Sequence, residues 1–137
     1  MVEAERVADV LGIEAADIRE LSRKVEQGLP KRSLVRVAER LAIHKTDIAR
    51  LRAAVVPDAT FKRRVRLSPQ ESERTERLAR VIAHAEYVWD DRDAAKEWLN
   101  LAHPLLDGKT PYQAALTDLG ARRVEDILHR IFYGIPA

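Results

Sequence analysis

The stretch SPQESERTERLARVIAHAEYVW, residues 68–89, decides the fold, because it has the pattern of one long amphipathic helix. Its apolar residues fall at i, i+3, i+4, i+7, i+10 and i+11, on one stripe of a helix: Leu78, Val81, Ile82, Ala85, Val88 and Trp89. Ser68 and Glu71 have the spacing of a capping box, and Pro69 occupies the first helical position, where its missing N–H costs nothing. We therefore expect a helix that begins after Ser68 and buries this stripe.

The residues that follow predict a second, shorter helix. Asp90 or Asp91 can cap its start, and Pro104 marks its end or the loop beyond it. The residues that share its apolar face are Ala94, Ala95, Trp98 and Leu99. Aromatic side chains at helical spacing beside Leu and Ile favour the core, so we expect Trp89 and Trp98 to be buried.

The last helix is also delimited by its sequence. Thr110 and Gln113 form a second capping box, and the final helix is expected to begin near Thr117. Its apolar stripe comprises Val124, Ile127, Leu128, Ile131 and Phe132. Gly134, with Pro136 beyond it, indicates where this helix ends.

The front of the chain contains an internal repeat. RVADVLGIEAADIREL, residues 6–21, and RVAERLAIHKTDIARL, residues 36–51, agree at eight of sixteen positions. Each copy has the pattern of helix, short turn and helix, and we expect Ile13 and Ile43 after the turns to pack on both helices. Either a true duplication or the convergence of two helix-turn-helix units explains the repeat. Because no sustained alternation of period two occurs, the predicted fold class is all-α.

The composition is that of one domain or two very small ones. The chain has 137 residues, of which 46% are hydrophobic and 34% charged. It contains no Cys, which excludes a disulfide framework, a thiolate zinc site and a Cys nucleophile. No run approaches the ~20 apolar residues of a membrane span, and the N-terminus is too charged for a signal peptide. We therefore expect a cytoplasmic protein with no membrane partner.

The charges are divided unevenly along the chain. Residues 1–66 contain 15 Lys and Arg against 10 Asp and Glu, whereas residues 67–137 contain 9 against 12. A basic first half and an acidic second half suggest two partners of different character, the first being nucleic acid. We place the boundary between two domains here, giving residues 1–66 and residues 67–137.

The segment PDATFKRRVR, residues 57–66, is the candidate nucleic-acid site. Pro57 and Asp58 can open a short helix, third in a tri-helical unit, which is the position of a recognition helix. The candidate DNA-binding residues on it are Thr60, Lys62, Arg63, Arg64 and Arg66. Arg can bond guanine edges bidentately, and Lys attracts phosphate. A solvated basic face, a charged linker, or a degenerate unit that only packs or dimerises are the alternatives.

The sequence offers no candidate catalytic site. Its four His residues, at positions 44, 84, 103 and 129, lack metal-ligand spacing, and no Cys can complete a zinc set. Capping of one helix explains the acidic group Asp90, Asp91 and Asp93. The chain has neither a Gly-rich phosphate loop nor a nucleophile elbow. We therefore predict no enzymatic activity, no metal and no cofactor.

The second half resembles a known family. The shared pattern comprises LARVIAHAEYVWDD (residues 78–91), Trp98-Leu99, Gly108, Thr110-Pro111, Gly120-Ala121, residues 124–126, and Tyr133-Gly134. Residues 68–137 thereby resemble the toxin-binding domain of the MbcA/ParS/Xre antitoxins, the partners of RES-domain toxins. The first half is similar to the Xre-type helix-turn-helix DNA-binding region of that family, with Gly28-Leu29-Pro30 like its usual opening.

The resemblance implies an antitoxin of a type II toxin–antitoxin system. Such a protein would form a homodimer, bind a RES-domain toxin in a higher hetero-oligomer, and repress its own operon by binding operator DNA. Family toxins consume NAD, by degrading it or by ADP-ribosyl transfer, and family antitoxins place their C-terminal end at the mouth of the toxin's NAD pocket. Carried onto this chain, the toxin-binding residues are Tyr133, Gly134, Ile135, Pro136 and Ala137, where Ile135-Pro136 replaces the commoner Val-Phe-small ending. The alternative function is a freestanding helix-turn-helix transcription regulator whose C-terminal half only dimerises.

Overall fold

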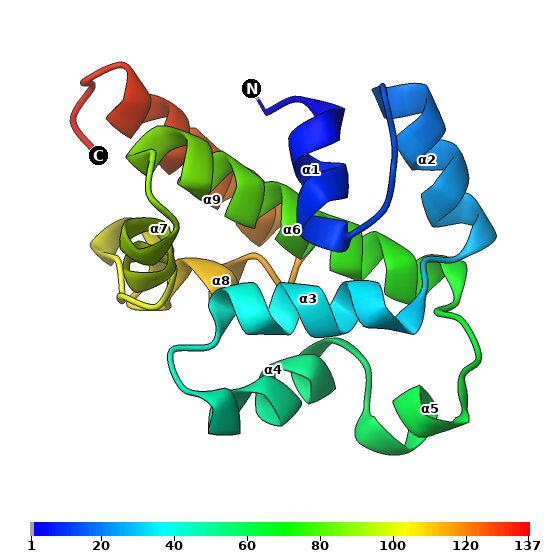
Figure 1. Cartoon of the computed structure of the whole chain (residues 1–137). Coiled ribbons are helices and arrows are strands. Elements are labelled where there is room, and N and C mark those ends of the chain that lie inside the picture. Colours follow the sequence, from blue (N-terminus) through cyan, green and yellow to red (C-terminus); the bar gives the residue numbers. More distant parts are fainter. Residues whose placement is uncertain (1) are drawn as a thin grey trace.

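The computed structural model describes residues 2–137, in which nine α-helices and two short 3-10 turns follow one another with no strand (Figure 1). The elements are α1 (Ala4–Leu11), α2 (Ile18–Gln27), α3 (Lys31–Leu41), η1 (Lys45–Asp47), α4 (Ile48–Val55), α5 (Asp58–Arg63), α6 (Pro69–Trp89), α7 (Arg92–Leu99), η2 (Pro104–Leu106), α8 (Pro111–Ala114) and α9 (Asp118–Phe132). The predicted all-α class is confirmed.

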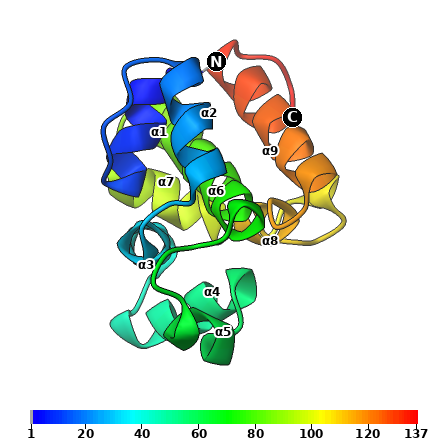
Figure 2. The same ribbon diagram turned by 90° about the vertical axis from the view of Figure 1, so that its right-hand side faces the viewer.

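The long helix α6 forms the centre of the fold. It packs against α1, α2 and α3 from the first half of the chain and against α7 and α9 from the second (Figures 1 and 2). Its predicted start is confirmed, since Ser68 Oγ accepts a hydrogen bond from the Glu71 N–H at 3.1 Å and the Glu71 carboxylate accepts one from the Ser68 N–H at 2.8 Å. Because both halves pack on one helix, their buried residues form one continuous core.

The helices α6 and α9 run parallel and end at the same end of the molecule. Arg80 Nε donates a hydrogen bond to Glu125 at 2.7 Å, and further along both helices the rings of Tyr87 and Phe132 lie 5.4 Å apart. The start of α9 lies close to α8, because a Cβ atom at Gly120 would lie 1.8 Å from the Ala114 carbonyl oxygen. Only glycine fits at this position.

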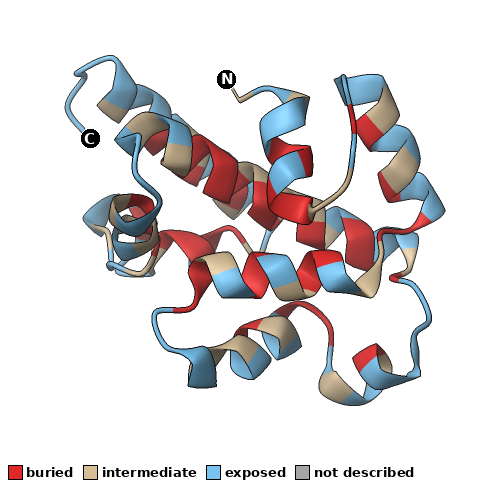
Figure 3. Cartoon of the chain, in the orientation of Figure 1, coloured by how far each residue is buried: buried red, intermediate tan, exposed pale blue. Residues whose placement is uncertain are grey.

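Three residues that the periodicity assigns to the interior are exposed instead. Trp89 is 39% exposed and Phe132 is 47% exposed, and each lies in the last turn of its helix. Figure 3 shows that burial is concentrated in the middle of α6 and falls off toward its end. Trp98, which is also predicted to be buried, is only partly buried against the core and is not one of these three. Ile43, predicted to pack on two helices, is 57% exposed, whereas its counterpart Ile13 packs on the core.

The two copies of the repeat form the same local elements in different surroundings. One copy becomes α1 and α2, and the other becomes α3, η1 and α4. Asp17 caps α2 by accepting a hydrogen bond from the Glu20 N–H at 2.8 Å, and the matching Asp47 accepts one from the His44 N–H at 3.4 Å. The first pair packs mainly on α6, whereas α3 and α4 pack closely on each other. Local sequence thus sets the helix starts, and the neighbours set which side chains are buried.

Candidate functional site

The short helix α5 is held against α3 and α4 by one buried aromatic ring. Phe61 is 7% exposed, and both Lys31 Nζ at the start of α3 and the guanidinium carbon of Arg52 on α4 lie 4.4 Å from its ring centroid. Asp58, at the first helical position, pairs with Lys62 at 3.1 Å and with Arg52. The hydrogen bond from Lys62 and that from Arg52 lower the pKa of the Asp58 carboxyl, although burial opposes them. These contacts fix a helix that is too short to be stable alone.

Three of the five predicted DNA-binding residues lie on α5. Thr60 is half-buried, and Lys62 and Arg63 are exposed. Lys62 shares its charge with Asp58, whereas the Arg63 guanidinium has no hydrogen-bond or ion-pair partner within residues 2–137. Arg63 is therefore the cation on α5 best placed to bind an external anion.

The other two residues lie beyond α5, so the prediction that one short helix carries all five is wrong. The chain is extended after α5. We call residues 64–67 the connector, because they lead from the end of α5 to the start of α6. Arg64 Nε donates a hydrogen bond to the buried Glu71 carboxylate at 3.1 Å. Burial acts to raise the pKa of Glu71, but hydrogen bonds from Ser68 and Arg64 outweigh it and lower this pKa. Arg66 Nη1 donates to the Gly28 carbonyl at 2.7 Å. Both arginines hold the connector in place.

The C-terminal tail, residues 133–137, leaves α9 at a backbone stop and is exposed along its length (Figures 1 and 3). Gly134 has a φ of 67°, in the left-handed region, and its N–H donates a hydrogen bond to the Ile131 carbonyl at 3.2 Å. The Ile135 N–H donates to the Arg130 carbonyl at 2.8 Å. These two hydrogen bonds form a Schellman motif, which ends the helix and fixes the direction in which the tail leaves it.

Aromatic side chains gather where the tail begins, and we call them the aromatic end: Tyr87, His129, Phe132 and Tyr133. The Phe132 ring centroid lies 5.4 Å from that of Tyr87 and 5.0 Å from that of Tyr133, which in turn lies 4.6 Å from that of His129. Tyr133 is 62% exposed. Sequence reasoning selected only Tyr133, because helical spacing assigned Phe132 to the core. Exposed clustered aromatic side chains are typical of protein-binding surfaces.

Beneath the aromatic end, the contact between α6 and α9 buries an uncharged histidine. His84 is 9% exposed, and burial, with a contribution from nearby His129, lowers the pKa of His84 to about 4. Two turns earlier on α6, burial raises the pKa of Glu76, against the opposing effect of Arg80. The base of the tail therefore rests on a packed interface that contains titratable groups.

The two candidate sites lie at opposite ends of the molecule, with α6 between them (Figures 1 and 2). Within residues 2–137, no three His, Cys, Asp or Glu side chains gather as a group that could hold a metal ion. A search of the same residues for a helix of the length and apolar character needed to cross a membrane finds none. The two sites offer cations at α5, and aromatic rings and apolar side chains at the tail. Cations, aromatic rings and apolar side chains of this kind form binding surfaces.

Comparison with known proteins gives matches to both halves of the chain. Residues 20–80 match the antitoxin Xre-like helix-turn-helix domain, and residues 84–134 match the antitoxin Xre/MbcA/ParS C-terminal toxin-binding domain. Over 125 residues the sequence is 30% identical to Antitoxin Xre of Pseudomonas putida, an alignment that covers 88% of this chain and 76% of that protein. The first matched domain includes α5, and the second extends to the first two residues of the tail.

Proposed function

This chain belongs to the Xre family of antitoxins, and from that premise we propose that its C-terminal tail occupies the active site of a cognate toxin while α5 binds operator DNA. The resemblance predicted from the sequence is confirmed by the matches over both halves, which identify a DNA-binding regulator with a toxin-binding domain. In our proposal the toxin is a RES-domain enzyme that consumes NAD, by degradation or by ADP-ribosyl transfer. Residues 1–66 bind DNA and dimerise, and residues 67–137 bind the toxin. In this proposal the antitoxin meets both partners in the cytoplasm.

One observation carries the proposal for the toxin: the tail is exposed and its exit from α9 is fixed. The Schellman motif at Gly134 directs residues 135–137 away from the core, and Pro136 restricts the backbone further. A segment already ordered before binding loses less conformational entropy when it binds. Occlusion of the toxin pocket by such a segment needs no catalytic group in the antitoxin.

Deleting residues 135–137 tests this proposal. The toxin's NAD consumption is measured in a mixture with the full chain or with the shortened chain, and we expect inhibition to weaken roughly a hundredfold, as for the loss of a central interface contact. A matched pair of point variants, Tyr133→Ala and Leu119→Ala, compares exposed apolar residues at the two ends of α9; Leu119 is 70% exposed. Only Tyr133→Ala should weaken inhibition. Undiminished inhibition by the shortened chain would exclude occlusion by the tail.

For operator binding, the supporting observation is Arg63, which has no ion-pair or hydrogen-bond partner among the described residues and lies on a helix fixed by Phe61. Arg63→Gln should weaken binding to a duplex taken from the region upstream of the chain's own operon, and it should flatten the dependence of affinity on salt. Arg122→Gln is the matched control, because Arg122 pairs with Asp118 on α9 and the change in net charge is the same. Equal affinities and salt slopes for the two variants would contradict the assignment to α5.

A second candidate function is a freestanding transcription regulator whose C-terminal half only dimerises. The exposed rings of the aromatic end are the observation that favours it, because they could equally pack against a second copy. Light scattering of the chain alone, with and without Tyr133→Ala, measures the oligomer, and the proposed homodimer should survive this substitution. If the variant is monomeric and the adjacent reading frame does not encode a RES-type protein, the second function is the better one.

A further inference from the structure

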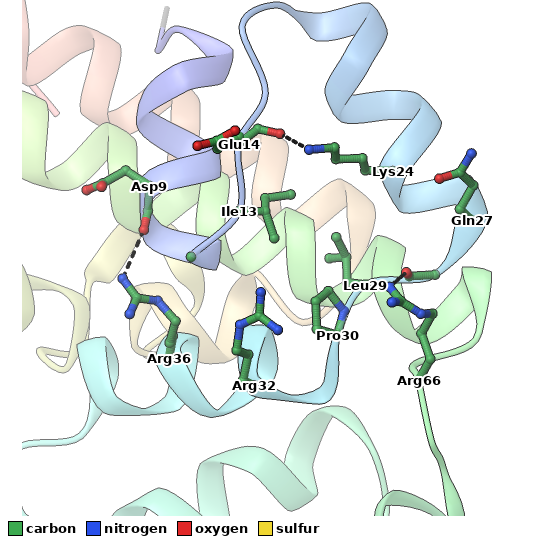
Figure 4. A pocket seen from close by; sticks show the side chains of 12 residues that line it. Asp9, Ile13, Glu14, Lys24, Gln27, Leu29, Pro30, Arg32, Arg36 and Arg66 are labelled. Carbon is green, nitrogen blue, oxygen red and sulfur yellow. Dashed lines mark hydrogen bonds between the residues drawn. The ribbon is translucent and has the colours of Figure 1, made fainter.

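A groove on the face of the molecule formed by α1, α2 and α3 gathers basic side chains from three segments of the chain (Figure 4). It has a volume of about 480 Å³. We call it the basic groove and define it by Lys24 of α2, Arg32 and Arg36 of α3, and Arg66 of the connector. Sequence reasoning selected only Arg66, because the other three come from helices that the groove brings together.

Two of these arginines are positioned by backbone carbonyls. Arg36 donates to the carbonyls of Val10 and Asp9, at 3.4 and 3.2 Å, at the end of α1, and Arg66 donates to the Gly28 carbonyl at the end of α2. Glycine makes room for Arg36, because a Cβ atom at Gly12, where φ is 70°, would lie 2.5 Å from the Arg36 side chain. The groove thus holds the guanidinium groups of Arg36 and Arg66 in fixed positions before any ligand arrives.

Within residues 2–137 the three arginines of the groove have no carboxylate partner, whereas Lys24 pairs with Glu20 at 3.7 Å. The carbonyls at a helix end carry about half an elementary charge in total, so each arginine that they hold keeps a net positive charge and free N–H donors. Arg32 has no hydrogen-bond or ion-pair partner within residues 2–137, and Figure 4 shows it between Arg36 and Pro30. Of the two acidic residues in the lining, Asp9 lies within 4 Å of Arg40 and Arg92 outside it. The groove suits an anion with several oxygens.

The connector joins the basic groove to α5. Arg66 forms an antiparallel bridge with Pro30, and the Leu67 N–H donates to the Leu29 carbonyl at 3.0 Å. The chain from Arg63 to Arg66 therefore places a cation at each end of one short exposed segment. A long polyanion that meets Arg63 can follow this segment to Arg66 and then to Arg32.

We propose that the basic groove binds the phosphate backbone of duplex DNA, adjacent to the part of the duplex that α5 contacts. This inference rests on the DNA binding proposed above and adds a second contact region from α2 and α3. Contacts to phosphate do not read the sequence, so the groove sets the position of α5 on the duplex and strengthens binding to all sequences alike. Each phosphate that the groove neutralises also makes the plot of log affinity against log salt concentration steeper by about 0.9.

The test uses the full chain and two labelled duplexes of equal length, one from the upstream region of the operon and one unrelated. Fluorescence anisotropy between about 50 and 200 mM salt gives the affinity and the slope. We expect Arg32→Gln to weaken both complexes by the same factor, roughly three- to tenfold, and to reduce the slope by about 0.9. Arg122→Gln, with the same change in net charge, should change neither. Thermal melting verifies that both variants are folded.

The outcomes separate this inference from the proposed function. If Arg63→Gln weakens binding but Arg32→Gln behaves like Arg122→Gln, DNA binding through α5 stands and the groove contact is wrong. If the unchanged chain binds neither duplex, both are wrong. A parallel titration with inorganic pyrophosphate at constant ionic strength addresses a free phosphate as the ligand. Pyrophosphate binding that Arg32→Gln abolishes, with duplex affinity unaltered, would overturn the assignment to DNA.

Discussion

α5 and the C-terminal tail are the two short segments that we propose as binding sites, and the chain holds them in different ways. α5 is fixed by side chains, since the Phe61 ring contacts Lys31 and Arg52. Asp58 pairs with the same Arg52 and with Lys62. The tail is fixed by backbone hydrogen bonds at the end of a 15-residue helix that packs in the core. The position of α5 therefore depends on a few side chains, whereas the position of the tail depends on how α9 packs.

The largest expected effect comes from removing the ring beneath α5. Phe61→Ala should lower the free energy of unfolding by about 4 kcal/mol, because a buried aromatic side chain and two cation–π contacts are lost. DNA affinity should fall while inhibition of the toxin persists in conditions where the variant is folded. Urea unfolding, duplex binding and NAD turnover are measured on the same sample. A parallel loss of inhibition would show that the two regions are not independent.

The next largest effect tests the support of the tail. Gly120→Ala should lower the free energy of unfolding by about 3 kcal/mol, because the new methyl group collides with the Ala114 carbonyl and must displace α9. Inhibition should weaken more than DNA binding. Gly108→Ala is the control, since a Cβ atom there meets nothing within 4 Å and only the left-handed backbone costs about 1 kcal/mol. Equal losses for the two variants would refute close packing as the cause.

A third prediction uses pH to weaken the base of the tail. Because the pKa of His84 falls to about 4 in the folded state, below its ordinary value of 6.5, the unfolded chain binds the proton more tightly. The stabilising contribution is therefore complete above pH 6.5 and is lost as the pH falls toward 4, by roughly 3 kcal/mol. Urea unfolding of the unchanged chain and of His84→Leu at several pH values isolates this contribution. Identical pH profiles would rule it out.

The substitution with the smallest expected effect on stability is the most direct test of how α5 and the tail differ. Gly134→Ala places a side chain at a φ of 67° and should cost only about 1 kcal/mol of folding free energy. Inhibition of the toxin should nevertheless fall several-fold more than this small loss explains, because the direction of the tail changes. Thermal melting and NAD turnover measure the two effects. If DNA affinity changes as well, the substitution acts on the whole fold.

The helix starts and stops could be predicted because local residues determine them. Ser68, Asp91, Thr110 and Thr117 each accept a hydrogen bond from a backbone N–H within three residues, and Gly134 ends α9 as expected. Such contacts are visible in a short window of sequence. For the same reason the all-α class followed from the periodicity of the chain.

Burial and pairing could not be predicted in the same way, because they depend on distant neighbours. Phe132 continues the apolar stripe of α9 but is its last residue, where it is 47% exposed beside the Tyr87 ring. Arg66 has the composition of a recognition segment, yet it holds Gly28, 38 residues earlier in the chain. The three other residues of the basic groove carried no local signal, since only the packing of α1, α2 and α3 brings them together.

The unbroken course of α6 has a consequence for the geometry of any assembly. Its 21 residues span roughly 30 Å between the connector and the aromatic end, with no hinge on the way. A toxin molecule bound at one end of α6 would consequently keep a fixed orientation relative to a duplex bound at the other end. The spacing of operator half-sites would then dictate how far apart neighbouring toxin molecules stand.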